Sequence, residues 1–200
     1  MSNKKNILRL SVIGAALLFY AALASGNRIN AGGENSPKTD DAKARAAFLE
    51  SYKVFSSARC VNCHPGGDRP LQGENSQPHA FLVERGADGK GFAALNCSAC
   101  HQDKNSPGMH APPGAEDWHL PPPEMKMTFE NKTAKELCEQ LKNPKLNGGR
   151  NLREVADHLG TGLVRWAWNP GGNRQKPPLE YEEFVESFET WRDSGAACPE

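Results

Sequence analysis

The sequence predicts a mostly α-helical protein that forms one small domain with long, irregular loops rich in proline and glycine. Three observations lead to this prediction. Apolar residues recur at helical spacing close to residue 41 and again close to the C-terminus. Two capping boxes precede apolar runs in the last third of the chain. Between these regions, residues 107–123 contain six prolines, which exclude a regular helix there.

The first 24 residues have the pattern of an export signal. Three cations precede the uncharged apolar run Leu10–Ala24, and alanines at positions 22 and 24 supply the small residues of a cleavage site. Because a helix needs about 20 apolar residues to span a bilayer, we expect a cleaved signal peptide over 1–24, with an uncleaved membrane anchor as the alternative. Residues 25–40 are polar and rich in Gly and Asn, which predicts a flexible linker before a domain at 41–200.

The charge balance and the expected location limit the class of protein. Lys and Arg together number 24, as do Asp and Glu, and loss of the cationic signal would make the domain slightly negative. Such a chain has no basic field for binding phosphates, so we do not expect nucleic acid as a partner. Export to the periplasm would place six cysteines in an oxidising compartment, where we expect all of them to be covalently committed.

The first predicted helix begins at Asp41 and ends shortly before Cys60. Its apolar positions are Ala44, Ala47, Phe48, Tyr52 and Phe55. The stretches that follow, 65–80 and 85–91, are rich in turn-forming residues. The proline-rich segment 107–123 is expected to be extended, and it is expected to pack on the domain because large apolar residues lie in it and just after it. These residues are Trp118, Leu120, Met125, Met127 and Phe129.

Three further helices are predicted in the last third of the chain. Thr133 with Glu136, and Asn151 with Glu154, have the spacing of capping boxes, so we expect helices to begin at these positions. An aromatic stripe near the C-terminus predicts a final helix with a buried face, formed by Tyr181, Phe184, Val185, Phe188 and Trp191.

The pattern Cys-x-x-Cys-His occurs twice, as CVNCH at 60–64 and as CSACH at 97–101. This pattern is the attachment signature of haem c. Two cysteines three positions apart lie on one face of a helical turn, where their sulfurs can bond the vinyl groups, and the next histidine can bind the iron. The sequence therefore predicts two covalently bound haems c in one domain. Their expected residues are Cys60, Cys63 and His64 for the first, and Cys97, Cys100 and His101 for the second.

Two other readings of the motifs remain open at this point. Two Cys-x-x-Cys knuckles also resemble a zinc ribbon, although structural zinc needs reduced thiolates and no histidine after each knuckle. A disulfide within each motif would indicate a thioredoxin-like protein, although the sequence shows no βαβ pattern. The export signal and the two histidines favour haem over both.

The second axial ligand of each iron would come from outside the motifs. We expect His79, His119 and His158 as candidate distal ligands, with His110 and the methionines at 109, 125 and 127 as further alternatives. His79 precedes an apolar run, His119 lies on the proline-rich segment, and His158 lies at the edge of an apolar helix face. A single histidine is more often a surface residue and a single methionine more often fills a gap, so each assignment stays open.

Cys138 and Cys198 remain after the motif cysteines are assigned. In an oxidising compartment we expect them to form a disulfide that joins the helix at 133–141 to the end of the chain. Two buried thiols are the alternative.

From about Arg59 to Pro199 the chain resembles a group of small exported di-haem cytochromes described as isoquinoline 1-oxidoreductase subunits. The stretches that show the resemblance are CVNCHPGGDRPLQGENSQPHA, CSACHQDKNSPGMHAPPGAEDWHLPPPEMKMTF, LCEQLKNPKLNGGR and WAWNPG. The resemblance implies an association with a molybdenum hydroxylase, which must discard electrons. It does not imply that this chain is the hydroxylase, because no cysteine remains for an iron–sulfur cluster.

Two functional classes follow from these expectations. In the first, both irons are six-coordinate and the protein carries single electrons between a redox enzyme and the respiratory chain. In the second, one iron keeps an open position and the protein is a haem enzyme or a sensor of a small ligand such as peroxide or nitric oxide. The four histidines outside the motifs favour the electron carrier, since they are sufficient to close both irons. A membrane contact is expected only if the N-terminal segment stays attached.

Overall fold

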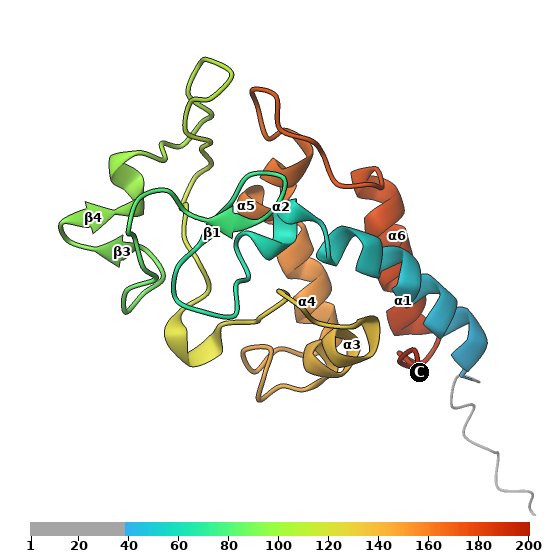
Figure 1. Ribbon diagram of the computed structural model, residues 1–200. Helices are drawn as coiled ribbons and strands as arrows, with labels where there is room; N and C mark the ends of the chain where they lie inside the picture. Colours follow the sequence, from blue (N-terminus) through green and yellow to red (C-terminus); the bar gives the residue numbers. More distant parts are fainter. Residues whose placement is uncertain (1–38) are drawn as a thin grey trace, which may run out of the picture. The chain divides into compact units, whose positions relative to one another are not determined.

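The computed structural model describes residues 39–200, so the expected export signal and most of the expected linker lie outside the described residues. The described part is mostly helical, with six α-helices and little sheet, as the sequence predicts. Long loops connect the elements (Figure 1). The α-helices are α1 (Asp41–Phe55), α2 (Ala58–Val61), α3 (Ala134–Lys142), α4 (Leu152–Leu159), α5 (Gly162–Arg165) and α6 (Tyr181–Asp193).

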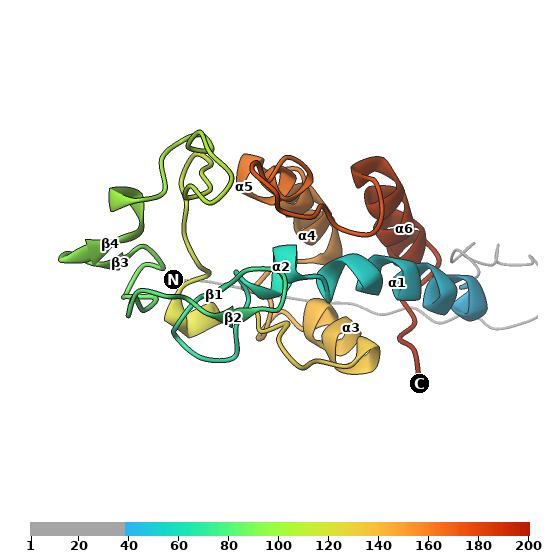
Figure 2. The ribbon, with the colours of Figure 1, turned by 45° about the horizontal axis from the view of Figure 1, so that its top comes forward.

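The apolar core lies where α1 packs along α6, on the opposite side of the described domain from the strands β3 (Gly91–Phe92) and β4 (Leu95–Asn96) in Figures 1 and 2. The Asp40 side chain begins α1 by accepting a 3.0 Å hydrogen bond from the backbone of Lys43. Aromatic rings from both helices form the centre of the core, as the aromatic stripe predicts. They are Phe48, Phe55, Phe184, Phe188 and Trp191, each at most 3% exposed.

Both expected capping boxes are present. The Thr133 and Glu136 side chains each bond the other residue's backbone at the start of α3, and Asn151 and Glu154 do the same at the start of α4. These reciprocal bonds satisfy backbone N–H groups that have no partner within the helix. The α3 residue Cys138 is joined to Cys198, with their sulfur atoms 2.02 Å apart.

The turn-rich stretches contain two short hairpins that the sequence analysis did not predict. One pairs β1 (Leu71–Gln72) with β2 (Gln77–Pro78), and the other pairs β3 with β4. Each strand has only two residues, which is too short for a recognisable alternation of apolar and polar positions. The first hairpin ends next to His79, and the second leads directly into Cys97.

The proline-rich segment forms no α-helix, as expected, and the short 3₁₀ helix η2 (Pro123–Met125) begins at its last residue. It packs on the domain, since Leu120 within it is 6% exposed and Phe129 just after it is 7% exposed. The guanidinium of Arg85, which is 1% exposed, donates hydrogen bonds to the Pro121 carbonyl and, at 2.9 Å, to the Gly67 carbonyl. Arg85 thus joins this segment to the loop that follows the first motif.

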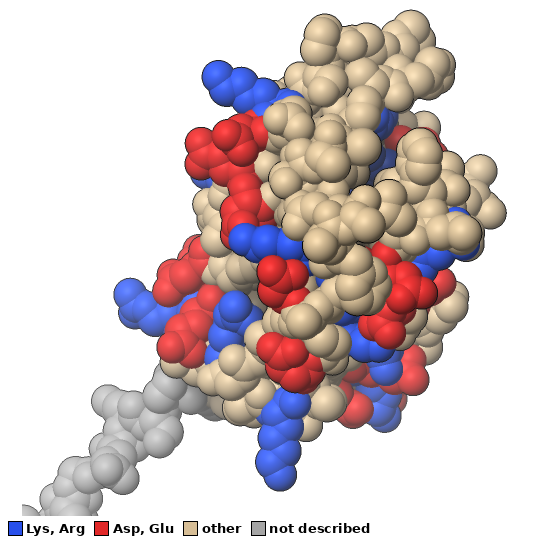
Figure 3. Space-filling view, turned by 90° about the vertical axis from the view of Figure 1, so that its left-hand side faces the viewer, with Lys and Arg blue, Asp and Glu red and all other residues tan. Residues whose placement is uncertain are grey.

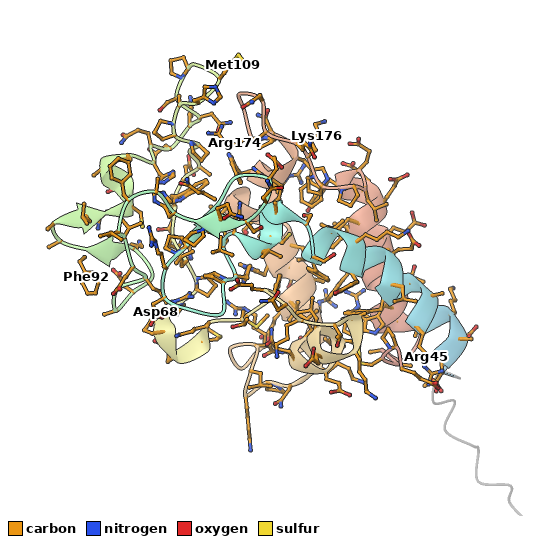
Figure 4. All side chains as sticks on the ribbon, viewed as in Figure 1. Arg45, Asp68, Phe92, Met109, Arg174 and Lys176 are labelled. Atoms are coloured by element: carbon orange, nitrogen blue, oxygen red, sulfur yellow. A yellow bond between two sulfur atoms is a disulfide. The ribbon has the colours of Figure 1, made fainter. Side chains whose placement is uncertain are left out.

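The face with β3 and β4 mixes acidic and basic side chains over its lower half and along its left edge in Figure 3, and is largely uncharged at the upper right. One pair of opposite charges is Lys90 with Asp117, at 2.7 Å. Figure 4 shows Phe92 at the outer edge of the β3–β4 hairpin and Met109 at the tip of a peripheral loop. Within residues 39–200, the structure has no helix that combines the length and the apolar character needed to cross a bilayer.

Candidate functional site

Each Cys-x-x-Cys-His motif folds as one helical turn. In the first motif, the turn at the end of α2, the backbone N–H of His64 donates to the Cys60 carbonyl at 3.1 Å. In the second, the 3₁₀ helix η1 (Cys97–Ala99), the N–H of His101 donates to the Cys97 carbonyl at 2.9 Å. The four motif cysteines form no disulfide. In each motif the two cysteines and the histidine therefore lie on one helical turn.

The imidazole of His64 is held from two sides by residues just after the proline-rich segment. Its Nδ1 lies 2.8 Å from the carbonyl oxygen of Met127, and its ring stacks on Phe129 with centroids 4.0 Å apart and an angle of 11°. Because a carbonyl only accepts hydrogen bonds, Nδ1 donates its hydrogen, and Nε2 is left with a free lone pair.

The imidazole of His101 is held in the same way by a different part of that segment. Its Nδ1 lies 2.7 Å from the carbonyl oxygen of Pro113, and its ring stacks on Trp118 with centroids 4.6 Å apart and an angle of 2°. This again leaves Nε2 free. A backbone carbonyl on the far nitrogen is the usual partner of a metal-binding histidine, because it fixes the tautomer and the ring direction.

A cavity of about 160 Å³, partly open to solvent, lies beside the first motif. Cys60, Cys63 and His64 line one part of it, and His119 and His158 line it as well. Apolar side chains form much of the remaining wall, among them Leu141, Val155, Leu159, Val164 and Phe184. The lining thus combines a histidine and two cysteines with mostly apolar walls, the donor set and the surroundings that a flat apolar cofactor requires.

Burial shifts the pKa values of the groups in the first motif. It lowers the pKa of His64 to about 4, so at neutral pH the imidazole is uncharged and can bind a metal. Burial, with the neighbouring Cys63, raises the pKa of Cys60 to about 12, and burial raises that of Cys63 to about 11, so without a bound group both are neutral thiols. The part of the chain that the structure describes contains no group of three or more His, Cys, Asp and Glu side chains placed to hold a metal ion.

The second motif is more exposed to solvent than the first, since Cys100 is exposed whereas Cys60 and Cys63 are partly buried. The candidate distal ligand His79 comes close to it, because the ring centroids of His79 and His101 are 6.2 Å apart with an angle of 62°. The pKa of His79 and that of His101 are both lowered, chiefly by burial.

The two motifs are connected electrostatically and by packing. The pKa of Cys63 in the first motif is raised chiefly by burial and also by Cys97 of the second, since each thiolate would disfavour the other. An aromatic pair also connects the sites. Trp118, which stacks on His101, meets Trp166 edge-to-face at 4.8 Å, and Trp166 lines the cavity beside the first motif.

The other predicted ligands divide between the first cavity and the surface. His119 has its Nδ1 against the backbone carbonyl of Asp117 and 3.4 Å from the Asp117 carboxylate. His158, on α4, is a second histidine in the same cavity, and Met125 and Met127 also line it. His110 is exposed and Met109 is 62% exposed.

Sequence reasoning named the motif histidines but missed the groups that orient them. The carbonyls of Met127 and Pro113 give no signal, because every residue has a carbonyl. The stacking rings could have been found from the sequence, because Trp118 and Phe129 are large apolar residues in or just after a segment that is otherwise typical of a surface loop. Nothing in the sequence indicates that Arg85 is buried.

Comparison of this chain with models of protein families, with curated proteins and with solved structures finds no match.

Proposed function

We propose that this chain is an exported c-type cytochrome with two covalent haems, which passes single electrons between redox partner proteins. The observation that supports this most is the repeated arrangement of the motif histidines. Both His64 and His101 follow a Cys-x-x-Cys turn, give Nδ1 to a backbone carbonyl, lie against an aromatic ring and keep Nε2 free. This arrangement fits a proximal haem ligand at each motif.

Each residue has a defined part in this proposal. Cys60 with Cys63, and Cys97 with Cys100, would form the thioether bonds, while His64 and His101 would bind the irons. The haem iron, when bound, supplies the change between ferric and ferrous states that takes up or releases one electron. The protein would fix the ligand direction and, at the first motif, place the group against mostly apolar walls.

The proposed partners follow from the resemblance seen in the sequence. The electron donor would be a redox enzyme such as a molybdenum hydroxylase, and the acceptor would be a component of the respiratory chain in the periplasm. A route in which an electron enters at one haem and leaves from the other is supported by the aromatic pair between the motifs, because Trp118 stacks on His101 and meets Trp166 at the wall of the cavity beside the first motif.

Haem stoichiometry tests the proposal. The protein is to be exported in a host that attaches haem c, and its haem is to be counted by the pyridine haemochrome spectrum and by intact mass. We expect two haems in the wild type, one in Cys60→Ala/Cys63→Ala and one in Cys97→Ala/Cys100→Ala. The matched control is Cys138→Ser/Cys198→Ser, which also removes two cysteines and should keep both haems. A wild type without covalent haem would overturn the proposal.

The cavity beside the first motif favours one second candidate, a haem enzyme or a sensor with an open iron position. Carbon monoxide separates the two functions, because it binds ferrous iron only where a coordination position is free or weakly held. If the dithionite-reduced spectrum is unchanged by carbon monoxide, both irons are closed, as an electron carrier requires. A shifted Soret band would favour the enzyme or sensor.

A further inference from the structure

We propose that His79 is the distal ligand of the iron that His101 binds. This inference rests on the proposed function, since it requires a haem at the second motif. It goes beyond that function by assigning one histidine to one iron.

The separation of the two rings is the first observation. A bond from a metal to an imidazole nitrogen is about 2.0 Å long, and in a five-membered ring with bonds of about 1.33 Å the atoms lie about 1.1 Å from the centre. Two imidazoles bound to opposite sides of one metal atom therefore have ring centres about 6.2 Å apart. The centroids of His79 and His101 are 6.2 Å apart. The gap between the rings thus matches one metal atom.

The ring of His79 also has an unused polar atom. Its Nδ1 is buried and has no hydrogen-bond partner among residues 39–200. No hydrogen bond to Nδ1 fixes the tautomer of this ring, so either ring nitrogen is available to a metal. His101 differs, because its Nδ1 donates to the Pro113 carbonyl and only its Nε2 is left for the iron.

The backbone on both sides of His79 is held firmly. Its N–H donates to the Pro70 carbonyl at 2.9 Å, and the Arg69 guanidinium donates to its carbonyl oxygen. The hairpin β1–β2 that ends next to it is attached in turn to the first motif, because the backbone N–H of Leu71 donates to the Asn62 carbonyl at 3.1 Å. The position of His79 is therefore set by the chain and does not depend on a mobile loop.

The other two candidates lie elsewhere. His119 and His158 both line the cavity that contains His64, so they can serve the first iron. His79 is the candidate whose ring faces the second motif at the required distance. One consequence is that the hairpin anchored to the first motif supplies a ligand to the second iron, so the two haem sites are interlocked.

Two substitutions and one control test the assignment. In His79→Ala we expect both haems to remain attached, one low-spin ferric signal to be lost from the electron paramagnetic resonance spectrum, and carbon monoxide to bind one more haem than in the wild type. In His79→Met we expect both low-spin signals to remain and the reduction potential of one haem to rise, because a thioether replaces an imidazole. The control is His110→Ala, which changes an exposed histidine and should match the wild type.

The outcomes separate the inference from the proposed function. If the wild type has two haems and His79→Ala retains both low-spin signals without new carbon monoxide binding, His79 is not a ligand while the di-haem function stands. If the wild type has no covalent haem, the proposed function itself fails. Should His79→Ala fold poorly, the potential shift of His79→Met decides, and an unshifted potential counts against the assignment.

Discussion

Phe129 is the residue at which the candidate haem site meets the apolar core. Its face stacks on His64 at 4.0 Å, its ring lies edge-to-face with Phe55 at 5.5 Å, and its backbone N–H donates to the His64 carbonyl at 2.9 Å. The side chain is only 7% exposed. One residue therefore both orients the proposed proximal ligand and contributes to the packing between the loops and α1.

Truncation of this ring should affect stability and the first haem together. In Phe129→Ala we expect the free energy of unfolding to fall by about 3–5 kcal/mol, since a buried aromatic side chain is replaced by a cavity. We also expect a change in the reduction potential of one haem, because His64 loses the ring that holds its plane. Urea unfolding and a redox titration of the haem-loaded protein measure the two effects.

Phe92→Ala is the matched control, as this ring is 55% exposed at the edge of its hairpin. A surface change of this kind should alter the free energy of unfolding by less than about 0.5 kcal/mol. Equal free energies of unfolding for Phe129→Ala and Phe92→Ala would show that the ring of Phe129 does not stabilise the core.

At the scale of single elements, α4 depends on Asn151, the residue that precedes it. The Asn151 side chain accepts hydrogen bonds from the backbone N–H groups of Arg153 and Glu154, both at 3.0 Å, and the Glu154 carboxylate accepts from the Asn151 N–H at 2.8 Å. The helix has only eight residues and places His158 beside the cavity. Short helices of this kind need caps, because their unpaired end groups are a large share of the total.

Loss of this cap should have a moderate cost. We expect Asn151→Ala to lower the free energy of unfolding by about 1 kcal/mol, because the backbone groups at the start of α4 lose their partner. Chemical denaturation of the haem-loaded protein provides the value. Asn151→Ser keeps an oxygen that can accept the same bonds and should restore most of the loss, whereas equal destabilisation by both substitutions would contradict a capping role.

The elements also show which features are accessible from sequence. The starts of α3 and α4 were predicted because a capping box lies within four consecutive residues, and α6 was predicted because its aromatic stripe repeats locally. The two hairpins were not predicted, since strands of two residues are too short to show an alternation of apolar and polar positions. The partners of His64 were not predicted either, because Met127 lies 63 residues further along the chain and only the tertiary fold brings it to Nδ1.

At the scale of the whole molecule, the C-terminus closes the domain. The bond between Cys138 and Cys198 joins α3 to the segment after α6, across a sequence separation of 60 residues. The same segment receives hydrogen bonds at 3.1 Å from Arg45 Nε to the Cys198 carbonyl and from Trp191 Nε1 to the Ala197 carbonyl. Three helices, α1, α3 and α6, are thus held together by the last residues of the chain.

Removal of the disulfide should destabilise the domain while both haems stay attached. For a loop of this length, we expect Cys138→Ser/Cys198→Ser to lower the free energy of unfolding by about 4 kcal/mol, because the unfolded chain regains the freedom that the cross-link had removed. Urea unfolding of the variant and of the oxidised wild type gives the difference. An unchanged midpoint would mean that the cross-link adds nothing to the non-covalent contacts.

The stacking and the carbonyl contacts of the two motif histidines also impose an order on assembly. Nδ1 of His101 finds its carbonyl 12 residues downstream, whereas Nδ1 of His64 finds its carbonyl 63 residues downstream. Contacts between near neighbours in sequence form faster than contacts between distant ones. In the export that we propose, the N-terminus would emerge first, so the contacts of His101 would form while His64 still waits for residues 127–129. The motif that emerges first would then be completed last.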